Sequence, residues 1–161
     1  MPRLDLAVLV GAELNAEVER QPREVGATEA IPFAFEKITK SPNTLDSHRL
    51  IRWAGIEGVQ DDVVERLFEL YFLEGADLND RNVLAGAAQE AGMDGEMVAR
   101  LLATDADLAE TEADVVHAQA IGVTGVPCFI LDGKYAVSGA QPADVLEGAI
   151  RQVAAERNKE D

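Results

Sequence analysis

Apolar residues recur at three- and four-residue spacing from about residue 44 to residue 122, a period that predicts amphipathic helices. The first helix is expected from Leu45 to about Ala54, with Gly55 and Gly58 as its stop. Four more helices are expected at about 61–75, 80–92, 94–102 and 105–122. Each of these begins at an aspartate that can cap it: Asp61 or Asp62, Asp80, Asp94 and Asp105. The pattern therefore predicts a block of about five helices, whose core includes Trp53, Phe68, Tyr71 and Phe72.

The pattern changes abruptly after residue 122. Val126–Leu131 is a short apolar run, Asp132-Gly133 suits a two-residue turn, and Lys134–Val137 can return as a partner strand. Gln141-Pro142 then begins a closing helix. Its apolar stripe consists of Val145, Leu146, Ala149, Ile150 and Val153. We expect a β-hairpin followed by one helix, with a frayed tail at 156–161.

The first forty residues have a weaker pattern. Residues 4–10 alternate between apolar and polar positions like a strand, yet residues 10–20 could equally begin an acidic helix, and the sequence leaves this open. Pro22 belongs in the first turn of a short helix that runs to about Thr28. Pro32–Lys40 reads as an extended connector. Its apolar side chains are Phe33, Phe35 and Ile38.

The charge of the chain excludes some classes of partner. Thirty acidic residues against fourteen basic ones give a formal net charge of −16, which repels nucleic acids and anionic lipid surfaces. No apolar run approaches the roughly 18 residues of a membrane span, and the opening residues do not read as a signal peptide. We expect a cytoplasmic protein. The length of 161 residues and the 47% of apolar residues favour one globular domain.

The chain has a single cysteine, Cys128. It therefore cannot form an intrachain disulfide or a zinc site built from several thiolates. Its position inside an apolar run favours an inert, small hydrophobic residue, because a reactive thiolate needs a nearby cation or helix N-terminus to lower its pKa.

Other polar residues offer little catalytic or metal chemistry. His48 and His117 are far apart in sequence and have no obvious third ligand, so we expect no metal site. The acidic run from Asp105 resembles a calcium loop, but Glu110 stands where that loop requires glycine. Asn43 and Thr44 precede the first helix, where capping explains them as well as a binding role does.

Two longer motifs carry a family resemblance. The run Gly122–Pro142, which reads GVTGVPCFILDGKYAVSGAQP, strongly resembles the DsbA-like thioredoxin-fold family, which includes FrnE-type oxidoreductases and 2-hydroxychromene-2-carboxylate isomerases. The run Pro42–Leu50, which reads PNTLDSHRL, resembles the same family. The resemblance extends from about residue 20 to the end. Family members carry a strand and a Cys-x-x-C pair before this region, and nothing in this chain matches those cysteines.

The resemblance implies an α/β fold: an incomplete thioredoxin-like fold with a mainly helical insert, a C-terminal hairpin and a closing helix. We expect a single domain over residues 1–161, with the insert at 44–122 and the C-terminal half at 123–157. Without the family's first strand, Phe129–Leu131 would be an open apolar edge. Either Leu4–Val10 supplies a substitute strand or two chains pair edge to edge as a homodimer.

The resemblance also implies a binding site. Pro127 falls where the family has a cis-proline, and in the family the main chain of the preceding residue, here Val126, pairs with an extended thiol-bearing substrate. Thr124, Asn43 and Thr44 complete the candidate substrate-binding residues. The expected partner is a thiol-containing peptide or glutathione. No catalytic residue and no metal or other cofactor is implied.

Three functions follow from these observations. The chain could be a thiol-disulfide oxidoreductase by descent, inactive or weak alone, because the two-cysteine route needs an attacking and a resolving thiol. It could be a glutathione-dependent isomerase or transferase, in which glutathione brings its own thiol, although a helix N-terminus must still stabilise that thiolate. The third function is a binding or assembly module without catalysis.

Overall fold

The structure, a computed structural model, describes residue 20 and residues 22–160. The chain forms two compact units that divide between Thr111 and Glu112. The hydrophobic pattern of the sequence places the boundary between the helical block and the C-terminal half later, between residues 122 and 123. That the whole chain acts as one domain stays a prediction.

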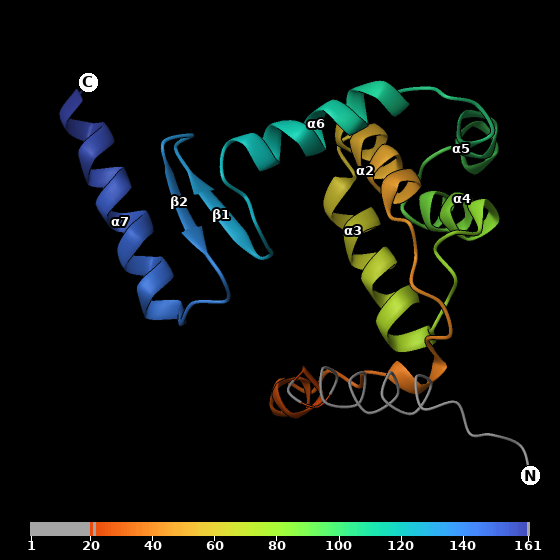
Figure 1. The fold of residues 1–161 in the computed structure, drawn as a ribbon, viewed down its shortest axis with the longest axis horizontal. Helices are drawn as coiled ribbons and strands as arrows, with labels where there is room; N and C mark the ends of the chain where they lie inside the picture. The colour runs from red at the N-terminus through yellow and green to blue at the C-terminus, as the bar shows by residue number, and fades with distance from the viewer. Residues whose placement is uncertain (1–19, 21, 161) are drawn as a thin grey trace, which may run out of the picture. The chain divides into compact units, whose positions relative to one another are not determined.

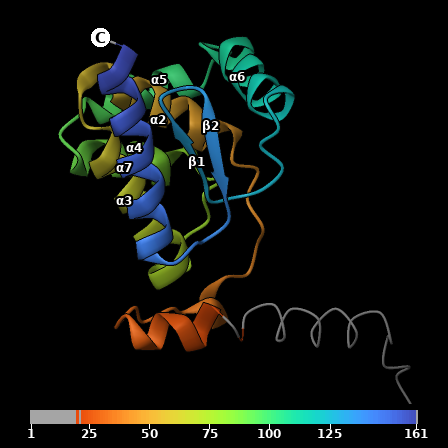
Figure 2. The ribbon, with the colours of Figure 1, turned by 90° about the vertical axis from the view of Figure 1, so that its left-hand side faces the viewer.

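The first unit contains the helical block. Residues 22–28 are helical and are followed by the short 3-10 helix η1, Phe35–Lys37, inside the expected connector. The helices that follow are α2 (Leu45–Glu57), α3 (Gln60–Glu69), the π-helical turn η2 (Leu70–Glu74), α4 (Arg81–Glu90), α5 (Gly95–Leu102) and the start of α6 (Leu108–Ala120) (Figure 1). The segment 22–37 lies across one end of α3, as Figures 1 and 2 both show.

The core of the first unit is made where α2 meets α3 and α4 meets α5. Leu50, Val63, Leu84 and Leu102 are completely buried, one from each of these helices. Burial of a leucine or valine side chain contributes about 1.5–3 kcal/mol, so the four helices stabilise one another through shared apolar stripes. The spacing of apolar residues therefore predicts this core.

One aromatic residue departs from that expectation. The periodicity assigns Phe68 to the core with Trp53, Tyr71 and Phe72, but its side chain is 57% exposed. Trp53 is buried and the other two are half-buried. The prediction is wrong for Phe68 because the buried stripe of α3 follows Val63 and Leu67, which leaves Phe68 on its edge.

Three boundaries in the helical block differ from the sequence-based expectation. α3 begins at Gln60 with Val59 at its N-cap position, so neither Asp61 nor Asp62 caps it, and both lie in its first turn. α2 continues through Gly55 and ends at Gly58, because Gly58 is the residue that adopts a left-handed φ of 78° and donates its N–H to the carbonyl of Ala54. α6 begins at Leu108 rather than at Asp105, after a turn in which Asp107 has a φ of 53°. The carbonyls of Thr104 and Ala106 in this turn accept hydrogen bonds from the buried Arg49, and these bonds keep the turn from joining the helix.

The predicted caps of two other helices are present. Asp80 accepts a hydrogen bond from the N–H of Asn82 at 2.8 Å, and Asp94 accepts one from the N–H of Met97 at 2.9 Å. Each bond satisfies a first-turn amide that has no partner within its helix. The starts of α4 and α5 are therefore set by local sequence.

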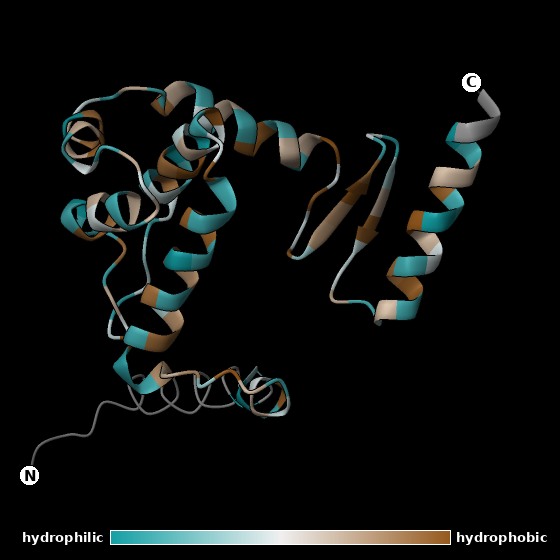
Figure 3. Cartoon of the chain, turned by 180° about the vertical axis from the view of Figure 1, so that it is seen from behind, coloured by the Kyte–Doolittle hydropathy of each residue, from teal (hydrophilic) through white to brown (hydrophobic). Residues whose placement is uncertain are grey.

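The second unit contains the end of α6, a hairpin and the closing helix. β1 (Cys128–Leu131) pairs antiparallel with β2 (Tyr135–Ser138), with Cys128 opposite Ser138. Asp132 and Gly133 have φ angles of 52° and 65°, as a type I′ turn requires. α7 covers Ala143–Glu160, so the expected frayed tail is helical instead up to Glu160. Apolar and polar residues alternate around α7 in Figure 3.

The hairpin has an open edge. Within the part of the chain that the structure describes, the sheet has two strands, so β1 pairs only with β2. Phe129 and Ile130 are partly exposed on it. The proposed substitute strand, Leu4–Val10, lies outside the described residues, and edge-to-edge pairing of two chains stays a prediction.

No helix within residues 20 and 22–160 combines the length and apolar character that a bilayer crossing needs. The cytoplasmic location stays a prediction from the sequence.

Candidate functional site

The loop between α6 and β1 carries three of the five predicted binding residues, Thr124, Val126 and Pro127. α6 ends where the N–H of Gly122 bonds to Gln119 and the N–H of Val123 bonds to Ala118, both at 3.0 Å. Gly122 has a φ of 92°, which a side chain would disfavour. The glycine therefore turns the chain out of the helix and into the loop.

Val126 is almost fully accessible in this loop. The residue is 91% exposed, and the peptide bond to Pro127 is cis. The carbonyl of Pro127 accepts a hydrogen bond from the N–H of Gly139 at 2.8 Å, which ties the end of the loop to the residue after β2. Among the described residues, neither the N–H nor the carbonyl of Val126 has a hydrogen-bond partner. These two main-chain groups are free to bind a ligand.

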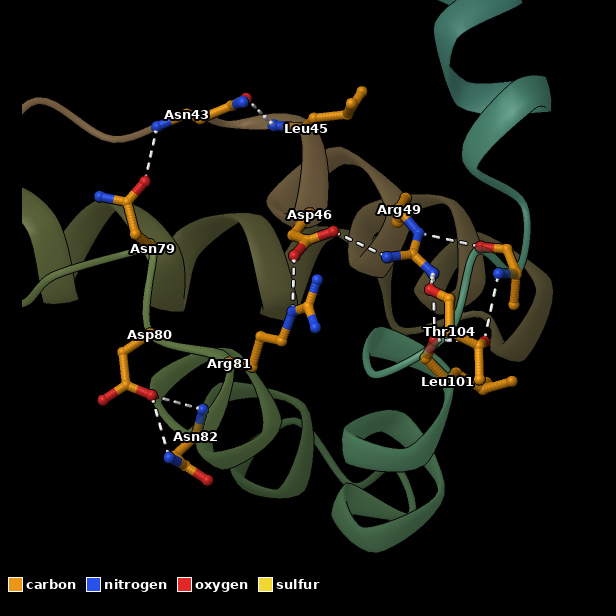
Figure 4. A network of polar contacts seen from close by, with 11 residues as sticks. Asn43, Leu45, Asp46, Arg49, Asn79, Asp80, Arg81, Asn82, Leu101 and Thr104 are labelled. Carbon is orange, nitrogen blue, oxygen red and sulfur yellow. Dashed lines mark hydrogen bonds and ion pairs between the residues drawn. The ribbon is translucent and has the colours of Figure 1, made fainter.

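Asn43 and Thr44 belong to the first unit, at the start of α2. The side-chain oxygen of Asn43 accepts a hydrogen bond from the N–H of Leu45 at 3.1 Å, and its own N–H donates to Asn79 at 2.8 Å (Figure 4). Thr44 occupies the N-cap position but makes no side-chain cap bond. Asn43 is thus engaged in capping and in fixing the connector to the loop before α4, while the binding role of both residues stays a prediction.

A buried arginine organises the motif that contains these residues. Arg49 is 1% exposed, and its guanidinium donates to the carbonyls of Ala106 at 2.9 Å, Leu101 at 3.0 Å and Thr104 at 2.8 Å (Figure 4). It also donates to Asp46 at 2.7 Å. A buried charge is tolerated only when its hydrogen bonds are satisfied, and these bonds hold the turn between α5 and α6 against α2.

Asp46 links this arginine to a second one. Its other oxygen accepts a hydrogen bond from Arg81 at 3.0 Å. Partial burial raises the pKa of Asp46, but the hydrogen bonds from Arg49 and Arg81 outweigh that effect and hold the pKa below its usual value. The carboxylate therefore stays ionised and joins α2 to α4.

Sequence reasoning missed Arg49 as an organising residue. The available signal is an aspartate and an arginine three residues apart within Pro42–Leu50, a spacing that brings two side chains together on a helix. That spacing could not reveal the three carbonyl acceptors, which come from residues more than fifty positions away.

Three further residues were candidates for thiol or metal chemistry. Cys128, which directly follows Pro127, is a free, half-buried cysteine at the start of β1. His48 and His117 are exposed on helices. Within residues 20 and 22–160, no three His, Cys, Asp or Glu side chains are grouped to hold a metal ion. The second-unit site thus offers main-chain hydrogen-bonding groups rather than an acid, a base or an activated nucleophile.

Comparison with known proteins adds a family. Residues 13–151 match the family model described as the DSBA-like thioredoxin domain. The chain is also similar to the crystal structure of a probable DsbA oxidoreductase from Streptomyces coelicolor, with 33% identity and a TM-score of 0.78. The match covers 89% of this chain and 62% of that one, so this chain spans less than two thirds of the solved relative. No curated protein matches the chain.

Proposed function

The chain belongs to the DSBA-like thioredoxin domain family, and we propose that its loop Thr124–Pro127 binds the main chain of an extended, thiol-containing peptide. In this proposal the protein is a thiol-disulfide oxidoreductase by descent that binds such substrates with little or no turnover of its own. The α/β thioredoxin-like fold and the oxidoreductase family are the parts that the family match and the solved relative carry.

The accessible main chain of Val126 supports substrate binding most directly. Its side chain points to solvent while its N–H and carbonyl have no partner within the described part of the chain. An extended peptide can satisfy both groups as a short added strand, a recognition mode that needs no particular side chain on the protein. The bond from Gly139 to Pro127 holds the loop in place, which lowers the entropy lost on binding.

The cysteine content supports weak turnover. Exchange of a disulfide by the two-cysteine route needs one thiolate to attack and a second thiol to resolve the mixed disulfide. Cys128 is the single cysteine of the chain, so it cannot do both.

The same cysteine count keeps the second candidate function open. Glutathione brings its own thiol, so a glutathione-dependent isomerase or transferase needs no protein cysteine. Glutathione would lie along Val126 and Pro127 with its peptide groups on the free main chain. A binding module without catalysis is the third candidate.

A calorimetric titration with a cysteine-containing peptide tests the binding mode. Methylation of the peptide's main-chain nitrogens should weaken binding about tenfold through the lost hydrogen bonds. Val126→Ala should change the affinity by no more than about threefold, because main-chain groups remain. Val116→Ala is the matched control, since Val116 is an exposed aliphatic residue on α6, outside the loop. Equal binding of the methylated peptide would exclude main-chain recognition.

An insulin-reduction assay and a glutathione titration then separate the three functions. Little reduction, unchanged in Cys128→Ser, is expected from the first proposal. Glutathione binding with NMR shifts at residues 124–127 would favour the isomerase class, and peptide binding without either activity would favour the binding module. Insulin reduction at the rate of a two-cysteine oxidoreductase would contradict the proposed lack of turnover.

A further inference from the structure

An apolar groove lies on the first unit. It shares no residue and no secondary-structure element with the loop Thr124–Pro127. It is bounded by the segment 22–35 on one side and by the end of α3 and η2 on the other. Its volume is about 750 Å³, within the range of ligand sites. The side chains that make its apolar surface include Ile31, Phe33, Phe35, Phe68, Phe72 and Leu73.

The aromatic lining is held in a defined arrangement. The ring of Phe33 lies 5.1 Å from that of Phe35 and 5.8 Å from that of Phe72, and Phe68 stacks on Phe72 at 5.9 Å. The N–H of Ala34 donates to the carbonyl of Phe72 at 2.8 Å, which fixes the two walls to each other. These contacts make a preformed surface, since each ring is positioned by another ring or by the main chain.

The charged side chains that line the groove are both acidic. Glu65 and Glu69 extend along the wall formed by α3. Glu69 pairs with Arg66 at 3.1 Å, whereas the carboxylate of Glu65 has no hydrogen bond or ion pair among the residues that the structure describes. An apolar ligand with a positive charge would therefore find a carboxylate beside the rings.

The chain itself shows how these rings receive a cation. The guanidinium of Arg23 lies 4.9 Å from the ring centre of Phe35, and the same guanidinium pairs with Glu36 at 3.1 Å. A cation is stabilised in this arrangement both by the face of the aromatic ring and by the carboxylate beside it. Phe68 and Glu65 offer the same pair of groups on the opposite wall, with Phe68 more than half exposed.

We propose that this groove binds a peptide segment of a partner protein in which large apolar side chains stand next to lysine or arginine. The acidic side chains of the groove disfavour two other occupants, a second copy of this chain and an anionic lipid. Two copies of this chain meeting groove to groove would bring Glu65 and Glu69 against the same residues, and anionic lipid would face both carboxylates.

The test uses the full chain and a synthetic acetylated, amidated heptapeptide that alternates phenylalanine or leucine with arginine. Calorimetry compares it with a peptide in which uncharged citrulline replaces each arginine. We expect the citrulline peptide to bind at least tenfold more weakly, and added salt to weaken the arginine peptide more than the citrulline peptide.

Two substitutions place the binding in the groove. Glu65→Lys and Phe68→Ala should each weaken the arginine peptide about tenfold. Glu96→Lys and Ile56→Ala are matched controls, since they change an exposed glutamate and an exposed apolar residue outside the groove, and they should leave the affinity within about twofold. Circular dichroism checks that each variant is folded. If Phe68→Ala does not fold, the affinity of Glu65→Lys alone decides the test.

Three results would overturn the proposal. These are equal binding of the citrulline peptide, binding that is absent or unaffected by the groove substitutions, and a dimer in sedimentation that Phe68→Ala dissociates. The last result would identify the occupant as a second copy of the chain.

Discussion

Arg49 shows at the scale of one residue how a buried charge becomes a structural element. Its guanidinium is almost fully buried and makes four hydrogen bonds, one to the carbonyl of Leu101 in the last turn of α5 and two to the carbonyls of Thr104 and Ala106 in the turn between α5 and α6. The central carbon of the guanidinium also lies 5.2 Å from the ring centre of Trp53. The indole N–H of Trp53 in turn donates a hydrogen bond to the carboxylate of Asp107 at 2.8 Å. The turn therefore has its shape because α2 supplies the donors.

Arg49→Met should reduce the free energy of unfolding by about 3 kcal/mol, since it removes a fully buried set of donors and leaves three part-buried carbonyls without them. Arg100→Met is the control, because Arg100 is exposed on α5 and pairs only loosely with Glu96, and it should cost less than about 1 kcal/mol. Urea denaturation followed by circular dichroism measures both. Equal losses in the two variants would show that the network does not stabilise the fold.

Asp77 should titrate well below a typical aspartate. Hydrogen bonds from Lys40 and Asn79 lower the pKa of Asp77 from 3.8 to about 2. Because the folded state then binds fewer protons than the unfolded state, this interaction stabilises the fold above about pH 4 and the stabilisation is lost as the pH falls through 2.

NMR titration of the Asp77 carboxyl carbon measures this pKa. Lys40→Met should raise it toward 3.8, since the ammonium that pairs with the carboxylate at 2.7 Å is removed. An unchanged titration in the variant would mean that Lys40 does not lower the pKa.

At the scale of elements, the connection between α3 and the connector depends on Gly75. This glycine ends η2 with a φ of 71°, and a Cβ atom there would overlap the side chain of Lys37 and lie 2.7 Å from its carbonyl carbon and oxygen. The π-helical turn and the close approach of the connector thus both require a residue without a side chain.

Gly75→Ala should cost about 3 kcal/mol or more, because the left-handed φ and the clash add together. Gly92→Ala is a matched control: Gly92 has a φ of 93°, but a Cβ atom there would meet no neighbour within 4 Å. Its cost should be about 1 kcal/mol. Thermal and urea unfolding measure the difference, and equal costs would show that the contact with Lys37 relaxes freely.

The elements also show how far local sequence reaches. The caps Asp80 and Asp94 and the turn Asp132-Gly133 were predictable, because each acts on neighbours within three residues. The start of α6 was not, because the competing hydrogen bonds come from Arg49. η2 was not predictable either, since an apolar period cannot distinguish a π-helical turn from the last turn of an α-helix.

At the scale of the whole molecule, the two units differ in how much they bury. The buried apolar residues all lie at or before Leu102, while the hairpin and α7 keep Phe129, Ile130, Val145 and Ile150 substantially exposed. Stability follows buried apolar contact, so it is concentrated in the first unit.

Amide hydrogen exchange should report this difference. Amides in the middle of α2 and α3 should exchange at least about a hundredfold more slowly than those of β1 and β2, because their helices open only when the core opens. Exchange is measured residue by residue by NMR. Equal protection of the hairpin and of the helices around Leu50 would contradict this distribution of stability.

Some features of the candidate site could be predicted from the sequence, and others became visible only in the structure. The motif Gly122–Pro142 identified the loop and its family, and the loop residues Thr124, Val126 and Pro127 lie together because they are neighbours in sequence. The free main chain of Val126 became visible only in the structure, because whether a main-chain group is paired depends on strands elsewhere. The same holds for the groove, whose walls at Phe33 and Phe68 are 35 positions apart.

By itself the sequence determined the family, the order of the elements and most of their boundaries, because periodicity, caps and turns act over a few residues. The tertiary structure alone decided where α6 begins, that Phe68 is exposed, and which polar groups are left free to bind. Those outcomes depend on contacts such as that of Arg49 with the turn at Thr104, which join residues distant along the chain and so leave no local pattern.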